Sequence, residues 1–162
     1  MSKQNTKDIT TSQLLSLIKK SNEFSEVTET YHDQEEEPLF CHFLYSIMQK
    51  HGKTATDVIV ESGIERSYFY HILSGQKSPG RNMVLRISLC LSATLTETNQ
   101  LLRLSRQGVL YPKVKRDAAI IFAIEKKYSM QQTNDLLIQE GELPLYKENR
   151  GGGMKGHESV VG

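Results

Sequence analysis

The chain has 162 residues, which suits one domain with a hydrophobic core, and 38% of them are apolar. No run of about 18 apolar residues occurs, and residues 1–13 lack the apolar core of a signal peptide, so we expect a cytoplasmic protein without a membrane span. The net charge is only +1, and Cys41 and Cys90 lie far apart on apolar helical faces, which favours buried thiols over a disulfide or a zinc site.

The charges are unevenly distributed along the chain. Residues 1–37 hold 4 Lys or Arg and 8 Asp or Glu, whereas residues 38–127 hold 13 and 6, and residues 128–162 hold 3 and 5. A basic excess in the middle of the chain is the expected footprint of a phosphate-binding surface. Ordinary solvated helix surface is the alternative explanation.

The first predicted element is a short amphipathic helix near residues 11–20. Its apolar face consists of Leu14, Leu15, Leu17 and Ile18. Residues 23–37 follow with seven carboxylates and no Lys or Arg, and we interpret them as a solvated linker. Residues 1–37 would then form an N-terminal helix and an acidic linker. Two other roles stay open for the acidic stretch, which could compete with DNA for a basic surface or bind a basic partner.

Residues 38–111 show the 3.6-residue periodicity of a helical bundle, with capping signals between the helices. The apolar stripe from Leu39 to Met48 predicts the first helix. The predicted N-caps of the second, fourth and fifth helices are Thr54, Asn82 and Thr94. Asp57 and Glu97 lie three residues after the first and last of these, as capping boxes require.

Residues 54–75, TATDVIVESGIERSYFYHILSG, predict two short helices joined by a tight turn. Phe69, Ile72 and Leu73 give the second helix an apolar face. Gly63 stands where the turn needs a residue at positive φ, which glycine adopts without a Cβ clash. Such a pair of helices can present the outward face of its second helix to the DNA major groove.

This segment resembles the λ-repressor-like (Xre/Cro) helix-turn-helix family, and the resemblance covers roughly Leu39 to Leu104. It lies in the turn Gly63-Ile64, in the apolar residues Phe69 and Ile72, and in Gly75, which is followed by a basic, Pro-containing loop. The resemblance implies a λ-repressor-like helical bundle from a bacterial or phage setting. It also implies a DNA-binding protein that often acts as a dimer on a two-fold site.

The resemblance further implies that the outward face of the second helix, with the loop after it, contacts DNA. The candidate DNA-binding residues are Arg66, Ser67, Tyr68, Tyr70, His71, Ser74, Lys77 and Arg81. Arg66 suits bidentate contact with guanine, and Lys77 and Arg81 suit phosphate. Each tyrosine could instead pack against a neighbouring helix or belong to a protein-binding patch, and these alternatives stay open.

A shift of 35 residues places segment 81–111 on segment 116–146 without a gap, with seven of 31 positions identical. We interpret this as two similar helical hairpins stacked in series, the second comprising Asp117–Lys127 and Ser129–Glu140. Residues 112–146 would then be a C-terminal hairpin packed on the bundle, with Asp117 as an N-cap. Chance similarity between two amphipathic hairpins is the alternative.

These patterns together predict an all-α protein, a λ-repressor-like helix-turn-helix bundle (38–111) with an extra C-terminal helical hairpin (112–146) and a flexible tail (147–162). The chain has no P-loop, dinucleotide-binding turn, nucleophile elbow or His-Glu metal helix. We therefore expect neither an enzyme nor a bound cofactor or metal.

The functional hypothesis is a sequence-specific transcriptional regulator that binds double-stranded DNA. Its candidate partners are a second copy, through apolar surface of the C-terminal hairpin, and another protein, through that hairpin or the N-terminal segment. The first alternative is a protein-interaction adaptor that keeps the fold without binding DNA. Ala55, where the family often has a phosphate-contacting Gln, and the aromatic residues of the second helix of the motif allow that alternative. Ile59, where the family usually has a small residue, implies a slightly different packing angle of the two helices. The second alternative is the antitoxin of a toxin–antitoxin pair.

Overall fold

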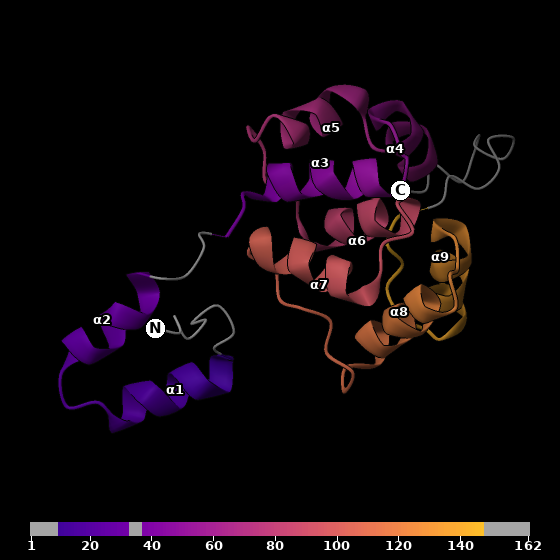
Figure 1. Ribbon diagram of the computed structural model, residues 1–162. Coiled ribbons are helices and arrows are strands. Elements are labelled where there is room, and N and C mark those ends of the chain that lie inside the picture. Colours follow the sequence, from indigo (N-terminus) through magenta and orange to yellow (C-terminus); the bar gives the residue numbers. More distant parts are fainter. Residues whose placement is uncertain (1–9, 33–36, 148–162) are drawn as a thin grey trace, which may run out of the picture. The chain divides into compact units, whose positions relative to one another are not determined.

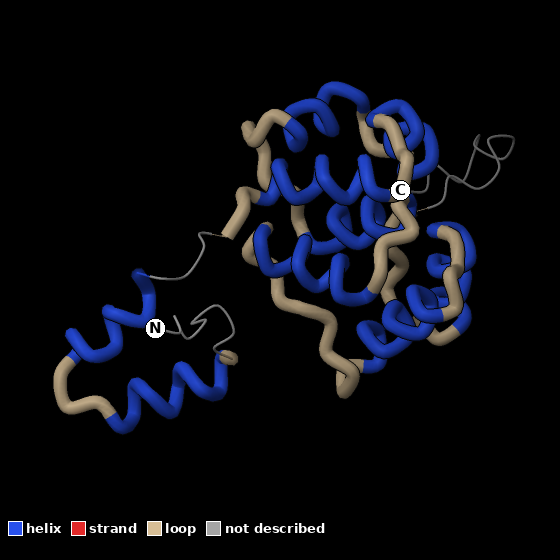
Figure 2. Tube along the Cα trace, in the orientation of Figure 1, coloured by secondary structure: helices blue, strands red, loops and turns tan. Residues whose placement is uncertain are grey.

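The computed structural model describes residues 10–32 and 37–147, and every regular element in those residues is an α-helix (Figures 1 and 2). The predicted all-α class is therefore confirmed. No helix within these two ranges is both long and apolar enough to cross a membrane. The chain divides into two compact units, Met1–Glu37 and Pro38–Gly162, which are described separately. All but the first residue of the predicted tail lies outside the described residues.

The first unit contains α1 (Thr11–Lys20) and α2 (Phe24–His32). Thr10 caps α1 in a capping box with Gln13, whose side chain accepts a 2.8 Å hydrogen bond from the Thr10 N–H. The predicted helix near residues 11–20 is thus confirmed. The linker predicted for residues 23–37 is wrong over its first part, because α2 begins at Phe24 and buries Val27. The run of carboxylates hid this apolar position.

The second unit contains α3 (Phe40–Lys50), α4 (Ala55–Ser62), α5 (Arg66–Leu73), α6 (Arg81–Cys90), α7 (Leu95–Leu104), α8 (Lys115–Glu125) and α9 (Met130–Gln139). Helix α3 contacts α5 and α7, and α4 packs on α6. The α8–α9 hairpin lies against the α6–α7 hairpin (Figure 1). Within this unit, α6 and α7 therefore have helices on two sides.

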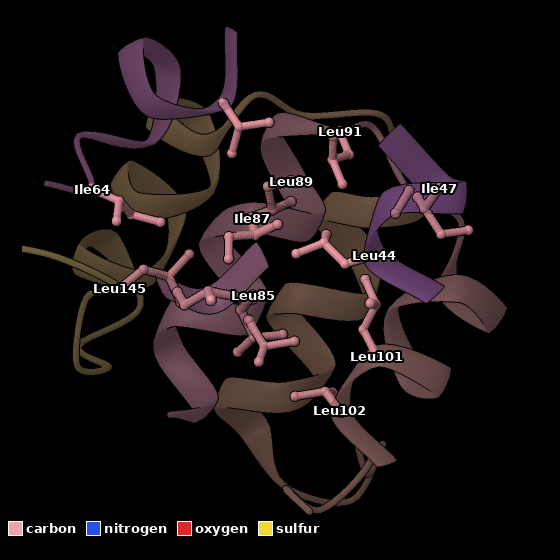
Figure 3. Packing of buried hydrophobic residues seen from close by; sticks show 14 of the residues in the cluster. Leu44, Ile47, Ile64, Leu85, Ile87, Leu89, Leu91, Leu101, Leu102 and Leu145 are labelled. Atoms are coloured by element: carbon pink, nitrogen blue, oxygen red, sulfur yellow. The ribbon is translucent and has the colours of Figure 1, made fainter. Parts of the chain in front are cut away.

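One apolar cluster joins the helices of the second unit (Figure 3). Leu44 of α3, Leu85 of α6 and Leu101 of α7 are completely buried in it, as are Phe69 and Ile72 of α5. Burying a side chain of this size contributes about 1.5–3 kcal/mol, so the apolar positions predicted for α5 dock that helix firmly on the bundle.

Two of the four predicted N-caps are confirmed. Thr54 and Thr94 form capping boxes with the acidic residues three positions later, and Ser129 forms the equivalent box at the start of α9. Two N-cap predictions are wrong. Helix α6 begins after Gly80, and the Asn82 side chain accepts a hydrogen bond from Arg116 instead.

Asp117 is the second incorrectly predicted N-cap. The N-cap of α8 is Val114, and Asp117 lies buried in the first turn of that helix. Its carboxylate accepts hydrogen bonds from Arg81 Nη2 at 2.9 Å and from the Tyr111 N–H at 3.0 Å. Arg116, the residue before Asp117, donates through Nε to the carbonyl of Leu143 at 2.8 Å. These residues join the two hairpins rather than only starting a helix.

The two hairpins match one another in backbone detail at the 35-residue shift. The limits of α7 and α9 differ by that shift at both ends. Asn99 Oδ1 accepts the N–H of Leu110 at 2.9 Å, and Asn134 Oδ1 accepts the N–H of Leu145 at 2.7 Å. The residues at positive φ also correspond, Ser92 with Lys127 and Arg106 with Gly141. Such agreement favours a true internal repeat over chance similarity.

The hairpins pair reciprocally, which differs from the predicted stacking in series. Helix α6 contacts α9 while α7 contacts α8, whereas serial stacking would place each helix on its own copy. The polar contacts follow the same exchange, since Arg81 bonds Asp117 and Arg116 bonds Asn82. This is the pattern of an approximate two-fold axis, in which equivalent sides of the two hairpins face one another.

Candidate nucleic-acid interface

The turn between α4 and α5 is set by Gly63 and Ser62. Gly63 has φ 69° and ψ 16°, the left-handed conformation predicted for it, and its N–H donates to the carbonyl of Ile59 at 3.1 Å. The Ser62 hydroxyl accepts the N–H of Ile64 at 3.2 Å, and Ile64 is itself buried. The turn therefore satisfies its own backbone groups and holds α5 at a fixed angle to α4.

Burial of Phe69 and Ile72 leaves the opposite face of α5 in solvent. The exposed candidate DNA-binding residues on this face and in the following loop are Arg66, Ser67, Tyr70, His71, Ser74 and Lys77. Tyr68 differs from them, because it is half-buried and packs against the apolar cluster. The two tyrosines therefore differ, because Tyr68 packs against neighbouring helices while Tyr70 remains 45% exposed.

The hydrogen bonds of Arg81 do not place its side chain beside the other candidate DNA-binding residues. It lies at the first position of α6 and donates to the carbonyl of Gly108 and to Asp117. Its guanidinium is therefore used in joining the two hairpins. The sequence placed it beside the loop, but the residues that bond it lie 27 and 36 positions away.

Glu65 is a charged residue of this site that the sequence analysis missed. It is the N-cap of α5, and its carboxylate accepts the N–H of Tyr68 at 2.8 Å. Hydrogen bonds from the backbone N–H groups of Tyr68 and Ser67 lower the pKa of this carboxyl, so it stays negative at neutral pH. The sequence signal for this cap was an acidic residue directly before the first helical residue, Arg66, and three residues before Tyr68. The start of α5 thus carries one anion beside one cation.

Arg86 is a second residue that the sequence analysis missed. It projects from α6 and donates through Nη2 to the carbonyl of Ser62, at the end of α4. Its guanidinium carbon lies 5.5 Å from the ring centroid of Tyr146, which is close enough for a cation–π contact. Arg86 therefore connects the α4–α5 turn with the end of the second hairpin. Its place among the apolar residues of α6 gave no sign of this role.

A surface pocket of about 440 Å³ is lined by residues of α4, the end of α6 and the start of α9. Cys90, Tyr128, Met130 and Tyr146 are among the residues that line it. Burial raises the pKa of the Cys90 thiol to about 12, so the thiol is protonated at neutral pH and is a poor nucleophile. The Cys90 Sγ instead lies 3.9 Å from the Met130 sulfur. This pocket does not supply an activated cysteine.

Comparisons of the chain with protein-family models, curated proteins and solved structures give no significant match. The resemblance over residues 39–104 therefore rests on the sequence alone.

Proposed function

We propose that the protein is a sequence-specific transcriptional regulator in which α4 and α5 act as a helix-turn-helix and α5 reads the major groove of DNA. The observation that carries this proposal is the division of α5 into two faces. One face is completely buried through Phe69 and Ile72, and the other exposes polar side chains from Arg66 to Ser74. A short helix anchored in this way can enter a groove without losing its own packing.

The charges around α5 indicate which contacts would supply affinity and which would supply specificity. Arg66 and Lys77 are exposed, and neither forms an ion pair within the described residues. Lys77 lies in the loop after α5, where a cation binds phosphate of any sequence. Arg66 lies in the first turn, where a guanidinium can contact guanine in bidentate fashion. Glu65 beside it would repel phosphate and so favours docking in one position.

Binding of duplex DNA by three variants tests the proposal. We expect Arg66→Ala to weaken binding to a preferred sequence by about 1–3 kcal/mol and to reduce the preference itself. Lys77→Ala should weaken binding to all sequences alike and should make the salt dependence less steep, because one fewer counterion is released. Lys113→Ala is the control, since it removes one charge from an exposed position outside α4 and α5.

Fluorescence anisotropy at several salt concentrations measures all three effects. If Lys113→Ala matches Arg66→Ala in both affinity and preference, binding follows net charge and α5 does not read sequence. A protein–protein adaptor is then the better function. The exposure of Tyr70 (45%) and of Val60 on α4 (73%) favours that second candidate, because exposed aromatic and aliphatic side chains suit a protein partner.

A further inference from the structure

The second hairpin has an apolar side that none of the described residues 37–147 covers. Its centre is Phe122, which is 46% exposed. Together with Ala118, Ala119 and Leu136 it lines a groove of about 370 Å³ between α8 and α9. Apolar side chains that gather around an exposed groove in this way are typical of an interaction site.

The internal repeat shows how the same side is used in the first hairpin. The residues 35 positions before Ala119, Phe122 and Leu136 are buried, and they are Val84, Ile87 and Leu101. Equivalent sides of the two hairpins face one another. The difference in burial therefore lies on the side of each hairpin that points away from the other hairpin. There α4 contacts α6 and α3 contacts α7. A layer of helices covers this side in the first hairpin, whereas α3, α4 and α5 do not form such a layer on the second hairpin.

We infer that a second copy of the chain binds this open side through the same surface, making a two-fold dimer of α8–α9 hairpins. Lys126 stands where the first hairpin has the buried Leu91, and Glu140 where it has the buried Ser105. These charges surround the apolar centre with a polar rim. Such a rim suits a reversible contact rather than a permanently buried core.

The two signs of charge favour a second copy as the partner. Lys115 and Lys126 lie near opposite ends of α8, and Glu140 lies at the Lys115 end, with 3.6 Å between Lys115 Nζ and Glu140 Oε2. In an antiparallel two-fold pairing, Lys126 of one copy lies over Glu140 of the other, and symmetry forms this pair twice. A rim of a single sign would repel its own copy.

Mass measured by sedimentation equilibrium over the micromolar range tests this dimer. The inference goes beyond the proposed function, because it rests on the repeat and its test contains no DNA. We expect a reversible monomer–dimer equilibrium that Phe122→Glu weakens at least tenfold. Ala118→Glu should weaken the dimer similarly, although it removes less side-chain packing than Phe122→Glu does. Circular dichroism checks that both variants keep their helices. Tyr45→Glu is the matched control, because Tyr45 is a somewhat more exposed aromatic (55%) on α3, and it should leave the equilibrium unchanged.

Exchanging the charges of the rim tests the antiparallel pairing. Lys126→Glu and Glu140→Lys should each weaken the dimer about two- to tenfold, as expected for the loss of two exposed ion pairs. The double variant should restore part of the lost affinity, because the charges are then exchanged in both copies, while Glu140→Lys still removes the ion pair with Lys115 of its own chain. A chain that stays monomeric throughout this range overturns the inference. So does a dimer that is indifferent to Phe122→Glu and Ala118→Glu, or a double variant as weak as the single ones.

Discussion

Glu97 joins the beginning of α7 to the end of α3. Its carboxylate accepts hydrogen bonds from Lys50 Nζ at 2.8 Å and the Thr94 N–H at 2.9 Å, and it lies 2.9 Å from His51 Nε2. Burial alone would raise the pKa of this carboxyl, but the bonds from Lys50, Thr94 and His51 outweigh burial and lower the pKa to about 2. The fold therefore stabilises the charged form of Glu97.

We expect Glu97→Gln to lower the free energy of unfolding at neutral pH by about 1–3 kcal/mol, since it removes charge-assisted hydrogen bonds. The folded pKa of about 2 lies below the ordinary 4.5, so the stabilisation is complete above about pH 5 and is lost as the pH falls toward 2. Urea unfolding should show the variant and the wild type converging in acid. Glu125→Gln, at an exposed position, is the control. A difference that stays constant with pH would contradict this account.

The roles of single residues followed from the sequence only where they depend on local geometry. Gly63 and Phe69 were predictable, because a positive φ and a helical spacing are properties of a few neighbouring residues. Arg81 and Asp117 were misplaced because they bond each other across 36 residues. Local sequence placed Arg81 beside the loop after α5 and Asp117 at the N-cap of its own helix. Arg86 was missed for the same reason.

The turns that end α7 and α9 offer an internal comparison at the scale of elements. The residue in the left-handed region is Arg106 after α7, with φ 62°, and Gly141 after α9, with φ 74°. This conformation costs a residue with a Cβ about 1–2 kcal/mol, and glycine avoids that cost. The second hairpin thus has the favourable residue at a position where the first does not.

We expect Arg106→Gly to keep the structure and to raise stability by up to about 1 kcal/mol, after allowing for the greater entropy of glycine in the unfolded chain. Gly141→Ala should lower stability by about 1 kcal/mol. Thermal unfolding measures both. Gly108→Ala is the control, because Gly108 does not have a positive φ and an added Cβ would meet only Arg81, at 3.7 Å. Equal losses at Gly108 and Gly141 would show that backbone strain does not explain the effect.

Helices were predictable where capping and periodicity agreed. The boxes that begin with Thr54, Thr94 and Ser129 each lie directly before a helix, because the N-cap and the third helical residue bond each other's backbone. Helix α2 was not predicted, since the charge of this segment was weighed above its apolar residues, of which Val27 is buried. The second hairpin was predicted two residues late at its start, where Val114 caps without a side-chain hydrogen bond.

At the scale of the whole second unit, the repeat predicted that the hairpins dock but not how they dock. Sequence similarity shows which residues correspond, whereas the sides that meet depend on long-range contacts such as that between Arg81 and Asp117. The two proposed interfaces are the outward face of α5 and the open side of α8 and α9. Both are surfaces that remain after the helices of this unit have packed, so they emerge only from the three-dimensional arrangement.

Selection of bound fragments from a random pool of duplex DNA tests the central claim, that α5 reads DNA sequence, most directly. We predict that the 162-residue chain enriches a short sequence, and that Arg66→Ala loses this preference at one or two positions while retaining salt-dependent binding to other DNA. A pool without any enriched sequence, bound equally well by the wild type and by Arg66→Ala, would contradict the claim.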